Sequence, residues 1–310
     1  MRYRLIVNPE AGGGTAPRAL PLIEEQLKTH QLDYDVLFTD RPWHAAGIAR
    51  DAARDRVDVV VAVGGDGTAN EALNGLMQAQ REGFDRTALG VLCVGRGNDF
   101  AYGVGIPTDV KTGCAALAAN RRRRIDVGWV EGDALPEGRY FGNGVGIGFD
   151  TVVGLEAAKL KRLRGFLGYL VAALKTIFLY FKAPQTRIEF RGATLDQRSL
   201  LVSVMNGRRM GGGFMMAPEG DPADGSFDLC ISCEVSRSRI FALIFRFMRG
   251  TQASHPAIQT GRTEWVTVTA IEGVLPAHAD GETLCTDGER LTMRLRPQAI
   301  DVIVEGEQVG

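Results

Sequence analysis

The pattern of hydrophobic and polar positions changes roughly 120 residues into the chain. Up to that point, apolar runs of strand length alternate with segments in which apolar residues recur at helical spacing. This pattern predicts strands at 2–7, 32–38, 57–63 and 88–94, and helices at 17–30, 43–54, 68–80 and 110–120. The run 57–63 is apolar almost throughout, which is typical of parallel strands buried on both faces. The first part is therefore predicted to be an α/β domain with a parallel sheet.

The second part of the chain is dominated by strand patterns. Strands are predicted at 125–130, 140–149, 187–190, 199–206, 227–232, 264–270, 276–279, 291–295 and 300–304. One long helix, over about 155–181, interrupts them. We place the boundary near residue 124, so that an α/β domain is followed by a β-rich domain.

Composition and charge exclude some partners and classes. The 310 residues carry a net charge of −1, which argues against a general attraction to nucleic acid. The N-terminal segment has no pattern of an export signal, which predicts a cytoplasmic protein. Five cysteines without such a signal argue against a disulfide framework. Cys230 and Cys233 would point to opposite faces of a strand, so buried thiols are favoured over a metal or redox pair.

The 39 glycines gather at turns, and one turn stands out. A buried strand ends at Val63 and is followed by Gly64-Gly65-Asp66-Gly67-Thr68-Ala69-Asn70-Glu71. Glycines let the backbone approach a ligand closely, and the start of a helix attracts anions. Thr68 and Glu71 have the spacing of a capping box, which predicts that the helix begins at Thr68. The turn is predicted to bind a phosphate, with Asp66 near a magnesium ion or its water.

Two further glycine turns follow other strands of the first domain, at 95–99 and at 8–15. In a parallel sheet such turns meet at the carboxyl edge, where ligands bind. Three together favour a nucleotide site over simple βα turns. The sequence has neither the P-loop pattern nor the Rossmann fingerprint after the first strand, which disfavours those two kinds of site.

The second domain adds two acidic loops. Asp280 and Glu282 flank Gly281, an arrangement that suits a base reaching a substrate hydroxyl near a metal, although acidic-glycine turns are common. The loop at 217–226 could bind a hard cation through carboxylate and carbonyl oxygens. Taken alone, a solvated turn is the simpler interpretation of this second loop.

Two apolar stretches allow two interpretations each. The predicted helix at 155–181 has a basic flank and falls short of a clean membrane span. It is either a buried helix packed on the second domain, or one that touches a membrane or lines an acyl-chain pocket. The stretch 240–248 has the same two interpretations. Arg121–Arg124 is predicted to be a solvated connection between the domains, and His44 a cap or surface residue.

Together these motifs resemble the bacterial diacylglycerol kinase family of soluble lipid kinases, which is related to sphingosine and ceramide kinases. The resemblance covers nearly the whole chain. It rests on Asn8-Pro9 with the glycines that follow, on the turn from Gly64 to Glu71, and on four further segments, which are 95–101, 143–150, 217–228 and 280–282.

The resemblance implies a fold and a reaction. The fold is an α/β ATP-binding domain at 1–124, a β-sandwich domain for the lipid at 125–296, and a tail at 297–310 that returns to the first domain. The active site is expected in the cleft between the domains. The reaction is transfer of phosphate from ATP, with Mg²⁺, to the hydroxyl of a lipid such as diacylglycerol or a sphingoid lipid.

The resemblance also implies roles for individual residues. Glu282 would accept the proton, with Asp280 and Asp66 as the other catalytic residues. Asp221, Asp224 and Ser226 match a structural magnesium site. The expected ATP-binding residues are Asn8, Thr39, Gly64, Gly65, Asp66, Gly67, Thr68, Ala69, Asn70, Arg96 and Asn98.

One turn departs from the family pattern. The family usually has Pro-x-Gly-Thr-x-Asn-Asp there, whereas this chain has Val94-Gly95-Arg96-Gly97-Asn98-Asp99. A threonine hydroxyl that would touch the nucleotide is missing. Arg96 could bind a phosphate in its place, because guanidinium groups form strong bonds to phosphate oxygens.

Three functions remain open at this point. The first is a lipid kinase of phospholipid metabolism with peripheral membrane contact at the inner face. The second is a kinase of a soluble substrate, similar to NAD kinase. The third is a non-catalytic protein that binds a nucleotide or a lipid. The apolar helix and Asp280-Gly281-Glu282 favour the first. The sequence allows a homodimer, and it selects no particular lipid.

Overall fold

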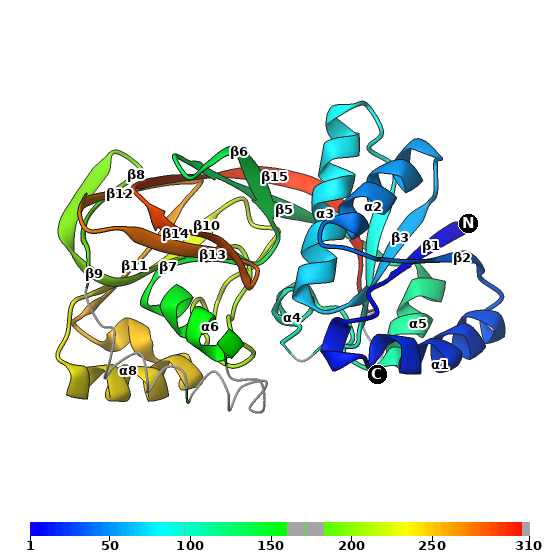
Figure 1. Ribbon diagram of the computed structural model, residues 1–310, viewed down its shortest axis with the longest axis horizontal. Helices are drawn as coiled ribbons and strands as arrows, with labels where there is room; N and C mark the ends of the chain where they lie inside the picture. Colours follow the sequence, from blue (N-terminus) through cyan, green and yellow to red (C-terminus); the bar gives the residue numbers. More distant parts are fainter. Residues whose placement is uncertain (96, 160–170, 172–182, 306–310) are drawn as a thin grey trace. The chain divides into compact units, whose positions relative to one another are not determined.

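The computed structural model describes residues 1–95, 97–159, 171 and 183–305 (Figure 1). It divides into two compact units, Met1–Asp126 together with Gln298–Gly310, and Val127–Pro297. The predicted helix at 155–181 lies mainly outside the described residues, and its beginning belongs to α6 (Phe149–Lys159).

The first unit is built on a parallel sheet. Its strands are β1 (Arg2–Val7), β2 (Asp33–Phe38), β3 (Val59–Gly64) and β4 (Ala88–Cys93), in the order β4-β3-β1-β2. The end of β15 (Arg290–Ile303) lies parallel to β4, with Val302 opposite Leu89. Every residue of β3 and β4 is buried, as the apolar runs predicted. The predicted parallel α/β sheet is therefore confirmed.

Helices cover both faces of this sheet (Figure 1). On one face α1 (Ala16–Thr29) packs beside α5 (Val110–Ala119), and they share a core cluster with Leu5 and Val61. On the other face α2 (His44–Arg54) packs against α3 (Asp66–Arg81). A Cβ on Gly75 would lie 2.1 Å from the carbonyl oxygen of Ala46, so only glycine permits this helix contact. Two short helices, η1 (Ala11–Gly13) and α4 (Asp99–Val104), follow β1 and β4.

The start of α3 differs from the prediction. The helix begins at Asp66 with Gly65 as its N-cap, and no side chain caps it. The predicted capping box is therefore wrong. Glu71 instead accepts a hydrogen bond from the backbone N–H of Ala45, 3.1 Å away, in the first turn of α2. A carboxylate is favourable there because of the helix dipole, so Glu71 stabilises the neighbouring helix.

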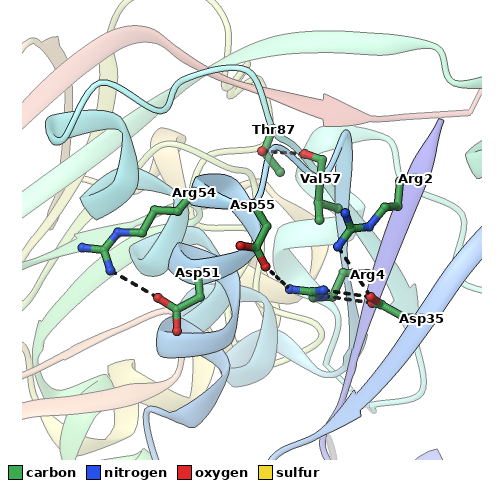
Figure 2. Close-up of polar contacts among 8 residues, drawn as sticks. All are labelled: Arg2, Arg4, Asp35, Asp51, Arg54, Asp55, Val57 and Thr87. Atoms are coloured by element: carbon green, nitrogen blue, oxygen red, sulfur yellow. Dashed lines mark hydrogen bonds and ion pairs between the residues drawn. The ribbon is translucent and has the colours of Figure 1, made fainter.

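An ion-pair network ties β1 to β2 (Figure 2). The guanidinium of Arg4 donates to both carboxylate oxygens of Asp35, at 2.9 and 2.8 Å, and to Asp55 at 3.1 Å. The hydrogen bond from Arg4 holds the pKa of Asp35 below its ordinary value. Nearby, the hydroxyl of Thr87 donates to the carbonyl oxygen of Val57 at 2.7 Å.

The second unit has two layers of antiparallel strands. One layer contains β5 (Arg122–Gly132), β6 (Leu135–Phe141), β8 (Gln185–Phe190), β12 (Trp265–Glu272) and β15. The other contains β7 (Gly144–Gly148), β10 (Phe227–Cys233), β11 (Ile258–Thr263), β13 (Leu275–Ala279) and β14 (Glu282–Gly288). The long strand β9 (Ala193–Met205) pairs with β8 through its first half and with β7 and β10 through its second.

Two hydrophobic cores flank the second layer. Alternate residues of its strands, such as Val202, Val204 and Phe227, pack against residues of the first layer, such as Val266 and Val268. On the opposite face, Met205 and Cys230 pack against the helix α8 (Arg237–Arg249). The short helix η2 (Gln252–Ser254) follows α8. The predicted fold class, an α/β domain with a β-sandwich domain, is confirmed.

Several element boundaries differ from the predictions. The predicted strand at 140–149 is divided between β6 and β7, with Gly142 and Asn143 in between. The two strands predicted at 291–295 and 300–304 form the single strand β15. Arg122, Arg123 and Arg124 begin β5, where Arg123 donates to the carbonyl of Val104 and Arg124 to that of Gln298. In the part of the chain that the structure describes, no helix has the length and apolar character needed to cross a membrane.

Candidate active site

The glycine turns after β1 and β4 contact each other in the first unit. The Thr15 hydroxyl donates a hydrogen bond to the carbonyl oxygen of Val94 at 2.9 Å. Gly12 lies between them with φ +63°, and a Cβ there would lie 2.4 Å from the same oxygen. The turn after β1 therefore needs glycine for its backbone conformation and for the close contact.

The turns after β3 and β4 are packed still more closely. A Cβ on Gly95 would lie 2.6 Å from the Cα of Gly65, and one on Gly97 would lie 2.8 Å from Oδ2 of Asp66. Backbone therefore meets backbone at this edge of the sheet. The prediction that the turns after β3 and β4 lie side by side is confirmed, and the turn after β1 contacts the turn after β4 as well.

Asp66 occupies the first position of α3, between these turns. Its Oδ1 accepts a hydrogen bond from the backbone N–H of Phe100 at 3.1 Å, which fixes the carboxylate to the start of α4. Asp66 is only half-buried. Burial, with a smaller contribution from the charge of Asp66, raises the pKa of the nearby Cys93 thiol to about 12. Cys93 therefore stays protonated at neutral pH.

Asn8 and Thr39 lie at the same edge. The amide of Asn8 donates to the hydroxyl of Thr68 at 3.1 Å, and its Oδ1 accepts from the N–H of Glu10 at 3.0 Å. Thr39 directly follows β2, and its N–H donates to the carbonyl of Val7 at 2.9 Å. The edge thus collects the predicted residues from the ends of β1, β2 and β3.

Other predicted ATP-binding residues are placed differently. The side chains of Ala69 and Asn70 are buried inside the unit, and Asn70 accepts a hydrogen bond from Asn74. Asn98 is the N-cap of α4 and donates to the carbonyl of Gly95 at 3.3 Å. Arg96 lies outside the described residues. The backbone groups of Gly65, Gly67 and Thr68 stand at the start of α3, where N–H groups lack intrahelical partners and suit a phosphate, and Gly64 ends β3 directly before them.

In the second unit, Asp280 is a fixed structural acceptor. Its Oδ2 accepts from the N–H of Gly142 at 2.7 Å, and its Oδ1 accepts from Asn143 and Gly144, each at 2.9 Å. The residue is only 6% exposed. Both carboxylate oxygens are occupied by backbone donors, so we describe Asp280 as a positioning residue rather than a base.

Glu282 stands beside it on an exposed hairpin. Ala279 and Glu282 are paired across β13 and β14, with Asp280 and Gly281 as the two-residue turn. Asp280 has φ +48° and Gly281 φ +83°, the positive values that a type I′ turn requires. The predicted flexible glycine therefore belongs to a tight turn, which presents the exposed Glu282 at a defined position.

The second acidic loop is organised around an arginine. Oδ1 of Asp221 accepts from the N–H of Ala223 at 3.0 Å, and Oδ1 of Asp224 accepts from the N–H of Ser226 at 3.0 Å. The guanidinium of Arg262 binds Oδ2 of Asp224. Burial raises the pKa of the neighbouring Asp228, while the charge of Arg262 opposes this.

This arrangement bears on the predicted metal site. Carboxylate oxygens are suitable ligands for Mg²⁺. In this loop, however, Asp224 already has both oxygens engaged, one of them by a cation. Among the described residues there is also no cluster of three or more His, Cys, Asp or Glu side chains that could hold a metal. As arranged, Asp221, Asp224 and Ser226 do not fit a bound magnesium ion.

A buried polar pair was not predicted from the sequence. His278 is 9% exposed, and its Nε2 lies 3.6 Å from Oδ2 of Asp150. Neither ring nitrogen has a hydrogen-bond partner among the residues described. Gly146 lies opposite His278 in the sheet, and a Cβ there would be 2.1 Å from Asp150 and 2.4 Å from His278. Gly146 thus makes room for the pair, which explains one glycine of the motif at 143–150.

Asp150 also borders an apolar cavity of about 50 Å³. The cavity is lined by the start of α6, by β9, by the segment around Met210 and Met216, and by α8. Asp150 is the one charged residue among its lining residues in the described part of the chain. The second unit therefore contains an apolar cavity with one acidic side chain at its border, an arrangement suited to an amphiphilic molecule.

The two domains match two family models. Residues 2–130 match the diacylglycerol kinase catalytic domain, and residues 143–304 match the YegS C-terminal NAD kinase beta sandwich-like domain. This chain belongs to the diacylglycerol kinase family. At the level of the family it is a kinase, a phosphotransferase that acts on an alcohol group.

Similar proteins span almost the whole chain. The diacylglycerol kinase of Bacillus subtilis (strain 168) is 28% identical over 283 residues, which cover 91% of this chain and 89% of that protein. The diacylglycerol kinase of Staphylococcus saprophyticus is 26% identical over 282 residues, covering 91% and 88%.

Solved structures share the fold. A diacylglycerol kinase from Bacillus anthracis str. Sterne superposes with a TM-score of 0.74 at 22% identity, covering 100% of this chain and 98% of that one. Yeast NADH kinase complexed with NADH superposes with a TM-score of 0.55 at 11% identity, covering 99% and 84%. The two-domain fold is thus common to both kinds of kinase.

Proposed function

We propose that the chain transfers the γ-phosphate of ATP to the hydroxyl group of a lipid such as diacylglycerol or a sphingoid lipid. The observation that carries this proposal is the contact among three glycine turns at the carboxyl edge of the parallel sheet, with Asp66 between them. The family supports a kinase, and the turns supply a place where backbone groups can hold phosphates.

ATP would bind at this edge. The N–H groups of Gly65, Gly67 and Thr68 would hold phosphate oxygens, and Thr39 and Asn98 would flank the nucleotide. Mg²⁺ would arrive with ATP as part of the substrate and neutralise charge on the phosphates. Asp66 is half-buried and fixed by Phe100, and it would hold a water of that ion.

The acceptor hydroxyl would lose its proton to Glu282. This carboxylate is exposed and is presented by a tight turn, so it can reach a substrate without breaking contacts of the fold. Asp280 supports that role by holding Gly142, Asn143 and Gly144 against the turn. General-base catalysis of this kind typically contributes 10²- to 10⁴-fold to the rate.

Two observations favour a lipid as the acceptor. The cavity of the second unit is apolar apart from Asp150, which suits a hydrocarbon chain better than a polar metabolite. The relatives over 91% of the chain carry the name diacylglycerol kinase. A protein that phosphorylates membrane lipids would work in the cytoplasm at the inner face of the membrane.

The soluble-substrate alternative rests on the fold shared with yeast NADH kinase. The two alternatives differ in the acceptor, so an acceptor comparison separates them. The purified protein would be given γ-labelled ATP and Mg²⁺ with a lipid extract in nonionic detergent micelles, and separately with NAD and a polar metabolite extract. Label in a lipid supports the proposal. Label only in a soluble product, or ATP binding without any product, contradicts it.

A further inference from the structure

Helix α8 has two unlike faces. Its inner face carries Ile240, Leu243, Ile244 and Phe247, which are buried and line the apolar cavity. Its outer face carries Ala242, Phe245 and Met248, which recur at a spacing of three and so form one stripe. Phe245 is 59% exposed and Met248 is 36% exposed. The helix therefore presents large apolar side chains to the solvent directly outside the cavity wall.

The charges of α8 all have one sign. Arg237, Arg239, Arg246 and Arg249 are its charged residues, and the helix has no acidic residue. Arg246 donates to the hydroxyl of Ser254 at 3.0 Å. Among the described residues, the guanidinium groups of Arg237, Arg239 and Arg249 have no hydrogen-bond or ion-pair partner. The chain as a whole has a net charge of −1, so this basic helix is a local feature.

We propose that the outer face of α8 docks on an anionic lipid bilayer. Phe245 and Met248 enter the boundary between headgroups and acyl chains, and the arginines bind anionic phosphates. Exposed aromatic side chains flanked by arginine are the pattern of a helix that lies in the membrane interface. Each arginine near an anionic surface adds roughly a fivefold gain in binding, or about 1 kcal/mol.

Charge complementarity decides between a bilayer and a second copy of the chain. A twofold dimer through this face would place like patches against each other, because such an interface is self-complementary. The unpaired arginines of the two copies would then repel. An anionic bilayer supplies opposite charges along the whole helix, together with an apolar layer for Phe245.

Docking by α8 extends the proposed function, and its biological role rests on that function. The inner face of α8 forms the cavity wall, so docking would bring that wall to the membrane from which a lipid acceptor is drawn. A lipid would then reach the cavity without crossing water. The docking itself, however, requires no ATP and no turnover, so it can be measured separately.

The test measures binding of the whole protein to vesicles by flotation, without ATP. Vesicles of phosphatidylcholine alone are compared with vesicles that contain phosphatidylglycerol. Two variants change the proposed surface, Phe245→Ser/Met248→Ser and Arg239→Glu/Arg249→Glu. Two control variants make the same kinds of change away from α8. Ile271→Ser replaces an apolar residue that is 52% exposed on β12. Arg56→Glu/Arg86→Glu reverses two exposed charges in the first unit. Circular dichroism and thermal melting confirm that each variant folds.

We expect wild type and both controls to bind the anionic vesicles and to release them as salt rises from about 0.1 to 0.5 M. The serine variant should bind roughly tenfold to 100-fold more weakly, because Phe245 loses its burial in lipid. The glutamate variant should bind at least about tenfold more weakly. Equal binding to neutral and anionic vesicles, no binding, or full binding by both surface variants overturns the proposal.

Two further readouts separate rival explanations. Sedimentation velocity tests whether the outer face of α8 binds a second copy of the chain. A dimer formed by wild type and not by the serine variant would overturn the proposal. Phosphate transfer to a lipid in nonionic micelles should be unchanged in the surface variants. Loss of vesicle binding with full activity in micelles supports docking by α8. Vesicle binding by wild type without any lipid product would contradict the proposed kinase function and leave the docking surface intact.

Discussion

Asp280 and Gly144 form two reciprocal hydrogen bonds. The carboxylate of Asp280 accepts from the N–H of Gly144 at 2.9 Å, and the carbonyl of Gly144 accepts from the N–H of Asp280 at 3.0 Å. The same carboxylate also holds Gly142 and Asn143. The hairpin that carries Glu282 is thereby fastened to the chain between β6 and β7, which explains why an acidic residue stands two positions before the proposed base.

The role of Asp280 predicts a stability defect. Asp280→Ala leaves three buried N–H groups without their acceptor, and lost hydrogen bonds to a charged group cost about 1.5–3 kcal/mol each when taken singly. We expect the free energy of unfolding, measured by urea denaturation, to fall by at least about 3 kcal/mol. A variant as stable as wild type that had lost only activity would show that Asp280 acts in the chemistry and not in positioning.

Gly95 should control nucleotide binding. Gly95→Ala places a Cβ 2.6 Å from the Cα of Gly65, so the two turns must separate. We expect the KM for ATP to rise at least about tenfold, because phosphate binding depends on the placement of these backbone groups. Gly47→Ala is the matched control, since a Cβ there meets nothing within 4 Å in α2. That control should keep the KM for ATP and gain roughly 0.5–1 kcal/mol in stability. Equal ATP affinity in the two variants would show that the contact between these turns does not determine nucleotide binding.

Arg262 should decide whether the acidic loop binds magnesium. In the wild type its guanidinium pairs with Asp224, so we expect Mg²⁺ to leave the Tm of the ligand-free protein unchanged. Arg262→Gln removes the cation and leaves the carboxylates of Asp221 and Asp224 for a metal ion. The Tm of this variant should then rise with Mg²⁺, and calcium should act in the same direction. A magnesium-dependent Tm in the wild type would show instead that Mg²⁺ displaces the guanidinium of Arg262 from Asp224.

The Arg4–Asp35 pair predicts a pH dependence of stability. Arg4 lowers the pKa of Asp35 below its value in the unfolded chain. The pair therefore stabilises the protein fully above about pH 4, the ordinary pKa of aspartate, and the stabilisation disappears as the pH falls through the lower folded pKa. Because Asp35 is 42% exposed, the effect is about 1 kcal/mol or less. In urea melts, Asp35→Asn should be less stable than wild type at pH 6, and the difference in stability should shrink as the pH falls below about 4. A constant difference at all pH values would contradict this account.

The sequence was sufficient for the fold class because of its local patterns. Buried parallel strands such as β3 are apolar throughout, and they alternate with helical segments, so the parallel sheet could be predicted. The glycine turns could also be located, because each directly follows a strand. Their contacts through Gly65 and Gly95 follow from the neighbouring positions of β3 and β4 in the sheet.

Long-range pairings could not be predicted from one sequence. Asp280 holds residues that lie 136 to 138 positions earlier in the chain, and nothing local to Asp280 indicates those donors. The same applies to His278 with Asp150, and to Arg262 with Asp224. The metal site at the acidic loop was implied by the family resemblance, and the sequence of the loop shows its carboxylates but not the arginine that faces them. The two faces of α8 likewise became distinct only once its inner residues were placed against the cavity.

The central claim is that this chain phosphorylates a lipid hydroxyl with Glu282 as the base. The most direct test is transfer of labelled γ-phosphate from MgATP to diacylglycerol in detergent micelles, with wild type and Glu282→Gln measured side by side. We predict a labelled phospholipid with wild type, and a kcat at least about 100-fold lower for Glu282→Gln. The KM for ATP and the Tm should stay unchanged, because Glu282 is exposed and outside the nucleotide turns. No labelled lipid from wild type, or equal rates for the two proteins, would contradict the claim.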